Sequence, residues 1–239
     1  MSQSTPLRYA IYFTPEPSSA LARFGARVIG YDSATGHDLA QPELKTVPSA
    51  QLFAATEAPR RYGFHATLVA PFTLREGNEA QLHECARAFC SRTKPVSLGR
   101  LDLATLSGFI ALVPGSPDPQ LTDFAARCVE HFNPLRAPLS ESDFARRNKE
   151  HLTSRQRAYL ERFGYPYVFD EFRFHMTLSH MLRETERDML LAELARAYAP
   201  IADEDHRIDA ISILRQNGPT SRFQILARYP LSGGNTTGG

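Results

Sequence analysis

The 239-residue chain is poor in cysteine, and Cys85, Cys90 and Cys128 form no C-x-x-C pair. An odd and sparse set of cysteines is atypical of a disulfide-stabilised domain and favours a reducing compartment. The chain also lacks an apolar run long enough to cross a membrane, and Met1 to Pro6 lack the apolar core of a signal peptide. We therefore expect a cytoplasmic protein with no membrane partner.

The chain has no excess of charge of either sign, because 27 Lys and Arg residues face 26 Asp and Glu residues. Proteins that bind nucleic acid usually carry a basic excess, so a large polyanion is not expected as the obligatory partner. Metal-ligand spacing is absent as well, and we expect neither a metal nor another cofactor. The histidines without such spacing are His37, His83, His131, His151 and His206.

The most informative feature that is present is a phrase that occurs twice. The sequence F-H-A-T-L at 64–68 returns as F-H-M-T-L at 174–178. Side chains alternate between the two faces of a strand. His65 and Thr67 therefore share one face of the first predicted strand, and His175 and Thr177 share one face of the second. The apolar residues on the opposite faces are Phe64, Ala66 and Leu68, and Phe172, Phe174, Met176 and Leu178. Two such strands in one chain predict two halves of a single active site.

The repeat extends beyond the histidines. Helical spacing over about 78–92 is followed by strand-like runs at 96–106 and 108–113, and helical spacing over about 184–198 is followed by strand-like runs at 208–215 and 222–228. A strand at 7–13 and a helix at 20–29 precede the repeat, and 31–59 is rich in turn-forming residues. Equal order of elements indicates a duplicated unit of strand, helix, strand and strand.

We predict one bilobal α+β domain over 1–231, with two pseudo-symmetric lobes whose antiparallel sheets flank a central cleft. Lobe one covers about 60–116, a helical insert about 117–166 and lobe two about 167–231, and residues 7–30 pack on the core. The insert is expected to close one end of the cleft. Its run Arg146 to Lys149 is interpreted as a solvated helix face. The Gly- and Thr-rich tail, 232–239, is expected to be disordered.

The paired motif resembles the two-histidine (2H) phosphoesterase superfamily over about 7–231. The longer phrases R-Y-A-I-Y-F at 8–13, R-R-Y-G-F-H at 60–65 and G-Y-P-Y at 164–167 are similar to one bacterial branch, the proteins encoded in phosphonate-degradation operons. The superfamily resemblance implies catalytic roles for His65 and His175 and phosphate binding by Thr67 and Thr177. The branch implies a small phosphorylated metabolite as the partner.

The residues independently fit this chemistry. Hydrolysis of a cyclic phosphate needs a base for water and an acid for the leaving alkoxide, and histidine titrates near neutral pH. Arg61 and Arg173 lie an even number of residues before His65 and His175, so on a strand they would share the face of these histidines. They are candidates for neutralising phosphate charge, with exposed surface positions as the equal alternative. Tyr12 and Tyr62 are candidate substrate contacts, with core aromatics as the slightly favoured alternative.

Three functions stay open from the sequence. The leading hypothesis is a metal-independent phosphoesterase, a cyclic phosphodiesterase acting on a small cyclic phosphate such as a phosphoribosyl cyclic phosphate of phosphonate metabolism. RNA is the less favoured substrate, for a 2′,3′-cyclic phosphodiesterase or a 2′-5′ RNA ligase-like enzyme. The third is a non-catalytic nucleotide-binding module. A monomer is favoured, and His180 is not expected to be catalytic because it lacks the parity of His175.

Overall fold

The computed structural model describes residues 7–75, 78–116, 118–148 and 150–233. The predicted tail at 232–239 lies outside this description apart from Ser232 and Gly233, and Lys149 of the predicted solvated run lies outside it too.

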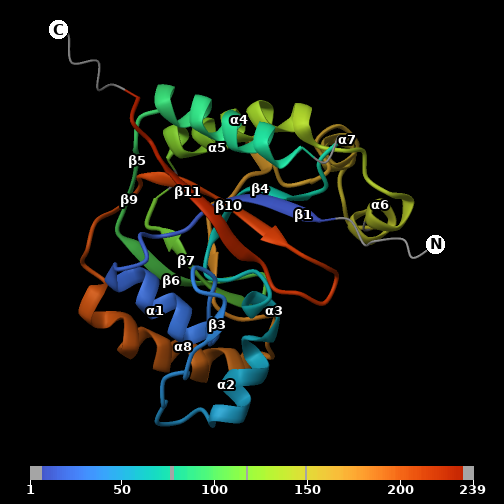
Figure 1. Ribbon diagram of the computed structural model, residues 1–239. Coiled ribbons are helices and arrows are strands. Elements are labelled where there is room, and N and C mark those ends of the chain that lie inside the picture. Colours follow the sequence, from blue (N-terminus) through green and yellow to red (C-terminus); the bar gives the residue numbers. More distant parts are fainter. Residues whose placement is uncertain (1–6, 76–77, 117, 149, 234–239) are drawn as a thin grey trace, which may run out of the picture.

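A seven-stranded antiparallel sheet forms the centre of the molecule, in the order β11-β10-β1-β4-β8-β7-β6 (Figure 1). Its strands are β1 (Arg8–Phe13), β4 (Ala66–Phe72), β6 (Leu101–Leu106), β7 (Phe109–Pro114), β8 (Met176–Thr177), β10 (Ala210–Gln216) and β11 (Gln224–Pro230). Two small ribbons accompany it: β2 (Tyr31–Asp32) with β3 (His37–Asp38), and β5 (Val96–Gly99) with β9 (His206–Ile208). The predicted α+β class is confirmed.

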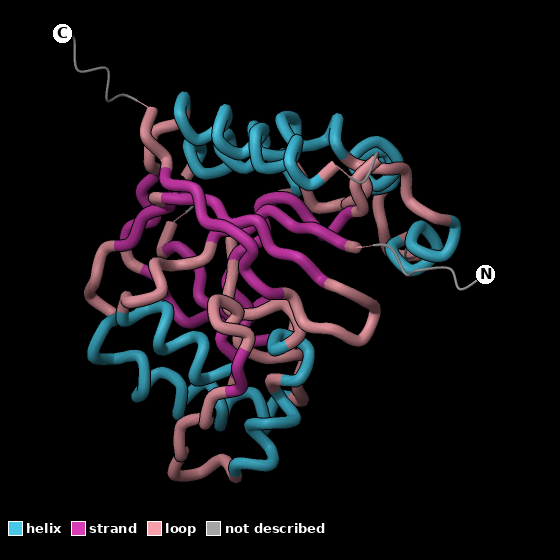
Figure 2. Tube along the Cα trace, in the orientation of Figure 1, coloured by secondary structure: helices cyan, strands magenta, loops and turns pink. Residues whose placement is uncertain are grey.

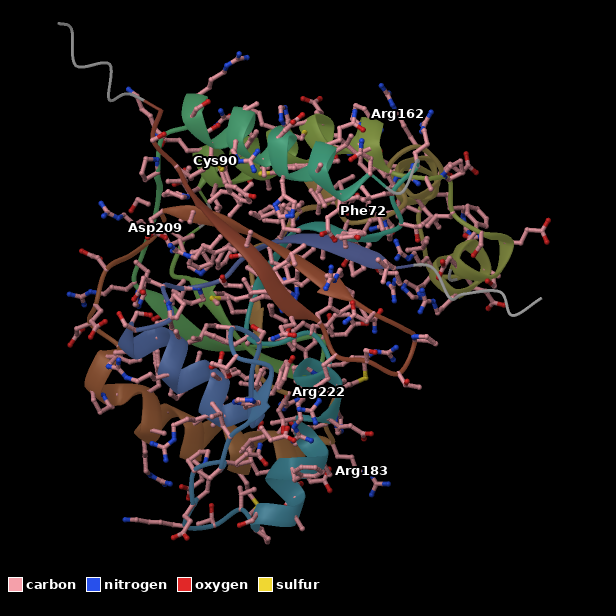
Figure 3. The ribbon with its side chains drawn as sticks, in the orientation of Figure 1. Phe72, Cys90, Arg162, Arg183, Asp209 and Arg222 are labelled. Atoms are coloured by element: carbon pink, nitrogen blue, oxygen red, sulfur yellow. The ribbon has the colours of Figure 1, made fainter. Side chains whose placement is uncertain are left out.

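Helices lie on both sides of the strands, as Figures 1 and 2 show. One pair is α4 (Glu79–Arg92) and α5 (Pro119–Phe132), and the other is α1 (Ala20–Ile29) and α8 (Glu184–Tyr198). The short helices α2 (Ser49–Ala55) and α3 (Glu57–Arg60) lead into β4, while α6 (Glu141–Arg147) and α7 (Ser154–Phe163) complete the insert. In Figure 3, Cys90 of α4 lies close to β11, and its thiol donates to the Tyr229 carbonyl at 3.6 Å.

Local sequence explains where the long helices begin and end. Ser19 and Asn78 cap α1 and α4 by accepting a backbone N–H with their side chains, and Thr153 forms a capping box with Gln156 at the start of α7. Gly30 ends α1 in the left-handed conformation, with φ of 74°. The predicted helices at 20–29, 78–92 and 184–198 therefore match α1, α4 and α8.

The strands of the two repeats are exchanged in space. Hairpin β6–β7 of the first repeat pairs with β8 of the second, and hairpin β10–β11 of the second repeat lies beside β1, which pairs with β4 of the first. Helix α4 packs on β10 and β11, and α8 packs on β6 and β7. Each half of the sheet thus combines a motif strand and its helix from one repeat with a hairpin from the other. The predicted lobes at 60–116 and 167–231 follow the chain, whereas the sheet halves do not.

Each predicted strand that leads into a hairpin is split in two. The run at 96–106 forms β5 and β6, and the run at 208–215 forms the end of β9 and nearly all of β10. The short pieces then pair with each other, Val96 opposite Ile208. Gly99, with φ of 59°, lies at the first break, where the left-handed backbone favours glycine. The two repeats are therefore also joined by the two-stranded ribbon of β5 and β9, which the alternation of apolar residues did not predict.

Candidate active site

The two motifs meet where the halves of the sheet join. Strands β4 and β8 pair antiparallel through Ala66 and Met176, both of which are buried. Continuing this register by one residue on each side places His65 across from Thr177 and Thr67 across from His175. The four polar side chains alternate with the buried residues and share the opposite face. The structure therefore brings both His-x-Thr motifs into one site, related by a local pseudo-twofold axis.

Each histidine is oriented by the same backbone contact. Nδ1 of His65 lies 2.8 Å from the Gly63 carbonyl oxygen, and Nδ1 of His175 lies 2.8 Å from the Arg173 carbonyl oxygen. A carbonyl only accepts, so each Nδ1 carries a proton and each Nε2 is left for the chemistry of the cleft. Nε2 of His65 lies 3.3 Å from Thr67 Oγ1. Gly63 has φ of 79°, and a Cβ there would lie 2.6 Å from that of Ser33, so this turn favours glycine.

The two imidazoles differ in their surroundings. The ring of Tyr12 stacks on His65 with centroids 3.8 Å apart, and the ring of Tyr62 lies 6.1 Å away. Burial lowers the pKa of His65 to about 4, the Gly63 hydrogen bond opposes this shift, and His175 adds to it. His65 is therefore neutral at neutral pH. The neighbour of His175 is Phe109, with centroids 5.7 Å apart.

A cleft of about 610 Å³ opens over this face of the sheet. Both histidines and both threonines of the motifs line it. Its other polar walls come from β1, α6 and nearby loops: Arg8, Tyr12, Tyr62, Arg146, Arg147, Tyr165, Ser179 and His180. Within the described ranges no carboxylate lines the cleft, so it is suited to an anion.

No group of three or more His, Cys, Asp or Glu side chains suited to a metal ion occurs in the described part of the chain. Likewise, none of the described helices is long and apolar enough to cross a membrane. The three cysteines are free thiols on α4 and α5.

Four further residues were predicted to contact substrate, and the structure places them differently. Tyr12 and Tyr62 line the cleft. Arg61 does not, because its guanidinium donates to the Pro219 carbonyl in the turn between β10 and β11. Arg173 is exposed, and its guanidinium donates to the carbonyls of Asp170 and Phe172 at 3.0 and 2.7 Å. Shared strand face did not bring Arg61 into the cleft, since a long side chain can turn back to a nearby carbonyl. Arg173 lines a neighbouring pocket of about 250 Å³ together with Thr67 and His175.

Sequence reasoning missed three arginines of the cleft. Arg8 shares the parity of Tyr12 on β1, and this signal was available in the sequence. Arg146 and Arg147 were interpreted as part of a solvated helix face. Arg146 is exposed as predicted and also lines the cleft, whereas the prediction is wrong for Arg147, which is partly buried and lines the cleft too. Arg147 donates to the carbonyl of Pro71, 76 residues away, and to that of Gly164, 17 residues away, and no local pattern predicts these contacts. His180 also lines the cleft, despite its different parity.

The family model described as "Protein of unknown function (DUF1045)" matches residues 67–224, about two thirds of the chain. The chain belongs to the DUF1045 family. The match begins at Thr67 of the first motif and includes the whole of the second.

Two curated relatives are both named Ribose 1,5-bisphosphate phosphokinase PhnN. The protein from Janthinobacterium sp. (strain Marseille) is 39% identical over 238 residues, which is 98% of this chain and 52% of the relative. The protein from Laribacter hongkongensis (strain HLHK9) is 35% identical over 190 residues, 79% of this chain and 44% of the relative. The chain thus spans about half the length of the curated relatives it matches. The family and these relatives fit the phosphonate-metabolism branch that the sequence resembles.

Solved structures with a related shape include E. coli LigT and a protein described as a phosphoesterase. E. coli LigT complexed with 3′-AMP has a TM-score of 0.44 at 12% identity, covering 95% of this chain and 99% of LigT. A structure described as a phosphoesterase has a TM-score of 0.39 at 14% identity, covering 96% of this chain and 99% of its own. The likeness is distant.

Proposed function

We propose that this protein is a metal-independent cyclic phosphodiesterase that opens a small cyclic phosphate with His65 and His175 as base and acid. The observation that carries the proposal is the register through Ala66 and Met176, which assembles two His-x-Thr motifs on one face. Two imidazoles in one cleft, each held to the backbone by Nδ1 and not by Nε2, suit in-line displacement at phosphorus, because a base and an acid are needed on opposite sides of it.

His65 is the base for hydrolysis in this proposal. Its neutral form holds the proton on Nδ1, so the Nε2 lone pair can take a proton from water. A low pKa keeps this nitrogen unprotonated at neutral pH. The hydroxide equivalent forms a bond to phosphorus as the bond to one ring oxygen of the cyclic phosphate breaks.

His175 is the acid. As an imidazolium it retains the Nδ1 contact with the Arg173 carbonyl and gives its Nε2 proton to the departing alkoxide. Thr67 and Thr177 donate hydrogen bonds to the two non-bridging oxygens of the phosphate, and Thr67 exchanges its contact with His65 Nε2 for this one. After one turnover His65 carries a proton and His175 lacks one, and exchange with solvent restores both. The product is a phosphate monoester with a free hydroxyl.

We propose a phosphoribosyl cyclic phosphate as the substrate. The curated relatives are named for a kinase of ribose 1,5-bisphosphate, which supports a phosphorylated ribose as the shared chemistry. The kinase activity itself is not proposed for this chain, which matches about half of each relative. A phosphate-binding loop of the form G-x-x-x-x-G-K-S/T does not occur in its 239 residues.

The test is turnover of a panel of cyclic phosphates by the purified protein in EDTA. The panel holds ribose 1,2-cyclic phosphate, its 5-phosphate, a 2′,3′-cyclic nucleotide and an RNA ending in a 2′,3′-cyclic phosphate. We expect the sugar phosphates to have the highest kcat/KM, and both His65→Ala and His175→Ala to abolish most of it. His37→Ala is the matched control, since His37 is exposed in β3 and does not line the cleft. Highest turnover on the RNA end would favour the RNA enzyme, and no turnover with tight ligand binding would favour the binding module.

A further inference from the structure

Three arginines gather at the end of the cleft beside α6 and the start of β1. Arg8 comes from β1, and Arg146 and Arg147 come from α6, which lies near the first residues of β1 in Figure 1. This group, the arginine cluster, lines the same cleft as the two His-x-Thr motifs. Neither the acid–base steps nor the threonine contacts use it.

Two of the three side chains are held in place by neutral partners. Nη2 of Arg147 donates to the Pro71 carbonyl at 2.8 Å, and its Nη1 donates to the Gly164 carbonyl. Nη1 of Arg8 donates to Gln216 Oε1 at 3.1 Å, and its guanidinium lies 5.7 Å from the centroid of the Phe223 ring. Carbonyl and amide oxygens fix the geometry of a guanidinium without cancelling its charge. Further N–H donors of each remain available, since a guanidinium has five.

The cluster carries more positive charge than its surroundings balance. Burial, and then the charges of Arg8 and Arg146, lower the pKa of Arg147, while Asp143 opposes the shift. Asp143 forms an ion pair with Arg146, with the two side chains 37% and 53% exposed, so this pair is weakened by solvent. Like charges held together cost free energy unless an anion joins them. The arrangement is that of a binding site for a phosphate group.

The arginine cluster lies close enough to the two histidines for one small ligand to contact both. Tyr12 of β1 is opposite Thr67 of β4. Arg8 precedes Tyr12 by four residues, and Pro71 follows Thr67 by four, so both are about 13 Å along their strands from the motif at 3.3 Å per residue. Long arginine side chains shorten the remaining gap. A phosphate on the threonines and a second anion on the cluster would therefore be joined by a scaffold the size of one sugar.

We propose that Arg8, Arg146 and Arg147 bind a second phosphate group of the substrate, a phosphomonoester on the same sugar that carries the cyclic phosphate. This inference rests on the proposed function and assigns to three residues the recognition of the phosphomonoester that a phosphoribosyl cyclic phosphate carries. Binding through the monoester positions the cyclic phosphate between His65 and His175. The cluster then decides specificity, because a substrate without the monoester leaves the excess positive charge of the three guanidinium groups without a phosphate to bind.

The experiment compares ribose 1,2-cyclic phosphate with and without a 5-phosphate, and measures the ratio of the two kcat/KM values. We expect a ratio of about 10 to 100 in the wild-type protein, the usual worth of a charge-assisted hydrogen bond to phosphate. Arg8→Met and Arg147→Met should each lower the ratio at least fivefold. Arg162→Gln is the matched control, because Arg162 lies on α7 of the same insert, is exposed and points outward from the molecule (Figure 3).

The variants keep the inference falsifiable. Arg147 links β4 to the end of α7 through the Pro71 and Gly164 carbonyls, so its replacement can disturb folding. Arg146→Gln provides a second test at an exposed side chain that donates to Asp143 alone among the contacts described. An unchanged ratio in folded Arg8→Met and Arg146→Gln would overturn the second subsite while leaving the phosphodiesterase intact. If neither sugar phosphate is turned over, the proposed function fails, and calorimetric binding of ribose 5-phosphate then tests the cluster alone. We expect that binding to weaken in the arginine variants, and equal affinity in all of them would overturn the inference.

Discussion

The burial of His65 predicts that activity persists to an unusually acidic pH. The pKa of this imidazole is lowered from 6.5 to about 4, first by burial. The base in the free enzyme sets the acidic limb of kcat/KM. At pH 5.5 an ordinary histidine is about 90% protonated, whereas a group of pKa about 4 is only about 3% protonated. The loss of kcat/KM through the base should therefore be negligible at pH 5.5.

The assay is kcat/KM between pH 3.5 and 8.5 at constant ionic strength, with the pKa of His65 followed in parallel by the NMR shifts of its ring. Tyr62→Ala removes a half-buried ring 6.1 Å from His65 and admits water, so the pKa should rise and the acidic limb should move toward 6.5. Tyr62→Phe keeps the ring and should leave the limb where it is. An acidic limb near 6.5 in the wild-type protein would refute this account of His65.

Folding must be followed across the same pH range. The folded pKa of His65 lies below the unfolded value of 6.5, so the unfolded chain binds this proton more readily. The stability that neutral His65 contributes is fully present above about pH 6.5 and is lost as pH falls through about 4. Circular dichroism at each pH separates this loss from titration of the base.

The remaining predictions concern the other parts of the molecule. Thr67→Ala and Thr177→Ala should each lower kcat/KM by roughly 10- to 100-fold, since each removes a hydrogen bond to a charged group worth about 1.5–3 kcal/mol, and losses above 10⁴-fold in steady-state assays would contradict this role. Arg61→Gln should leave kcat/KM within about threefold, because its guanidinium contacts the Pro219 carbonyl outside the cleft; a larger loss would return Arg61 to the site. Exhaustive treatment with EDTA should not change turnover, and restoration of lost activity by one divalent ion would disprove a metal-independent reaction. Phe124→Ala should lower the free energy of unfolding in urea by about 3–5 kcal/mol, because this fully buried ring packs against Phe89 between α5 and α4; a loss below about 1 kcal/mol would contradict that packing.

The alternation of apolar and polar residues within each motif predicted much of the site. Alternation in F-H-x-T-L placed Phe64, Ala66 and Met176 in the core and the His and Thr side chains on the other face, and burial agrees. This works because a strand side chain has only two directions. The histidines themselves precede β4 and β8, so the regular pairing is shorter than the pattern predicted.

The remaining features of the fold and the site could not be predicted, because they depend on contacts between residues far apart in the sequence. The exchange of hairpins between repeats depends on which sheet half each strand joins, and both choices bury the same apolar faces. Arg146 and Arg147 read as a charged helix surface, since nothing local shows that Pro71 and Gly164 offer carbonyls to Arg147. Arg173 acts through two parts: its backbone carbonyl orients His175, while its guanidinium donates to the Phe172 carbonyl and lines a neighbouring pocket with Thr67 and His175.

The most direct test of the two-histidine site is a cycle of His65→Ala, His175→Ala and the double variant, measured as kcat/KM on a cyclic phosphate that the wild-type protein cleaves in EDTA. Each single change should cost roughly 10²–10⁴-fold, the usual worth of a positioned acid or base. The double variant should cost less than the product of the two, because the pair acts as a unit. Folded single variants that both retain near-wild-type turnover would contradict the account.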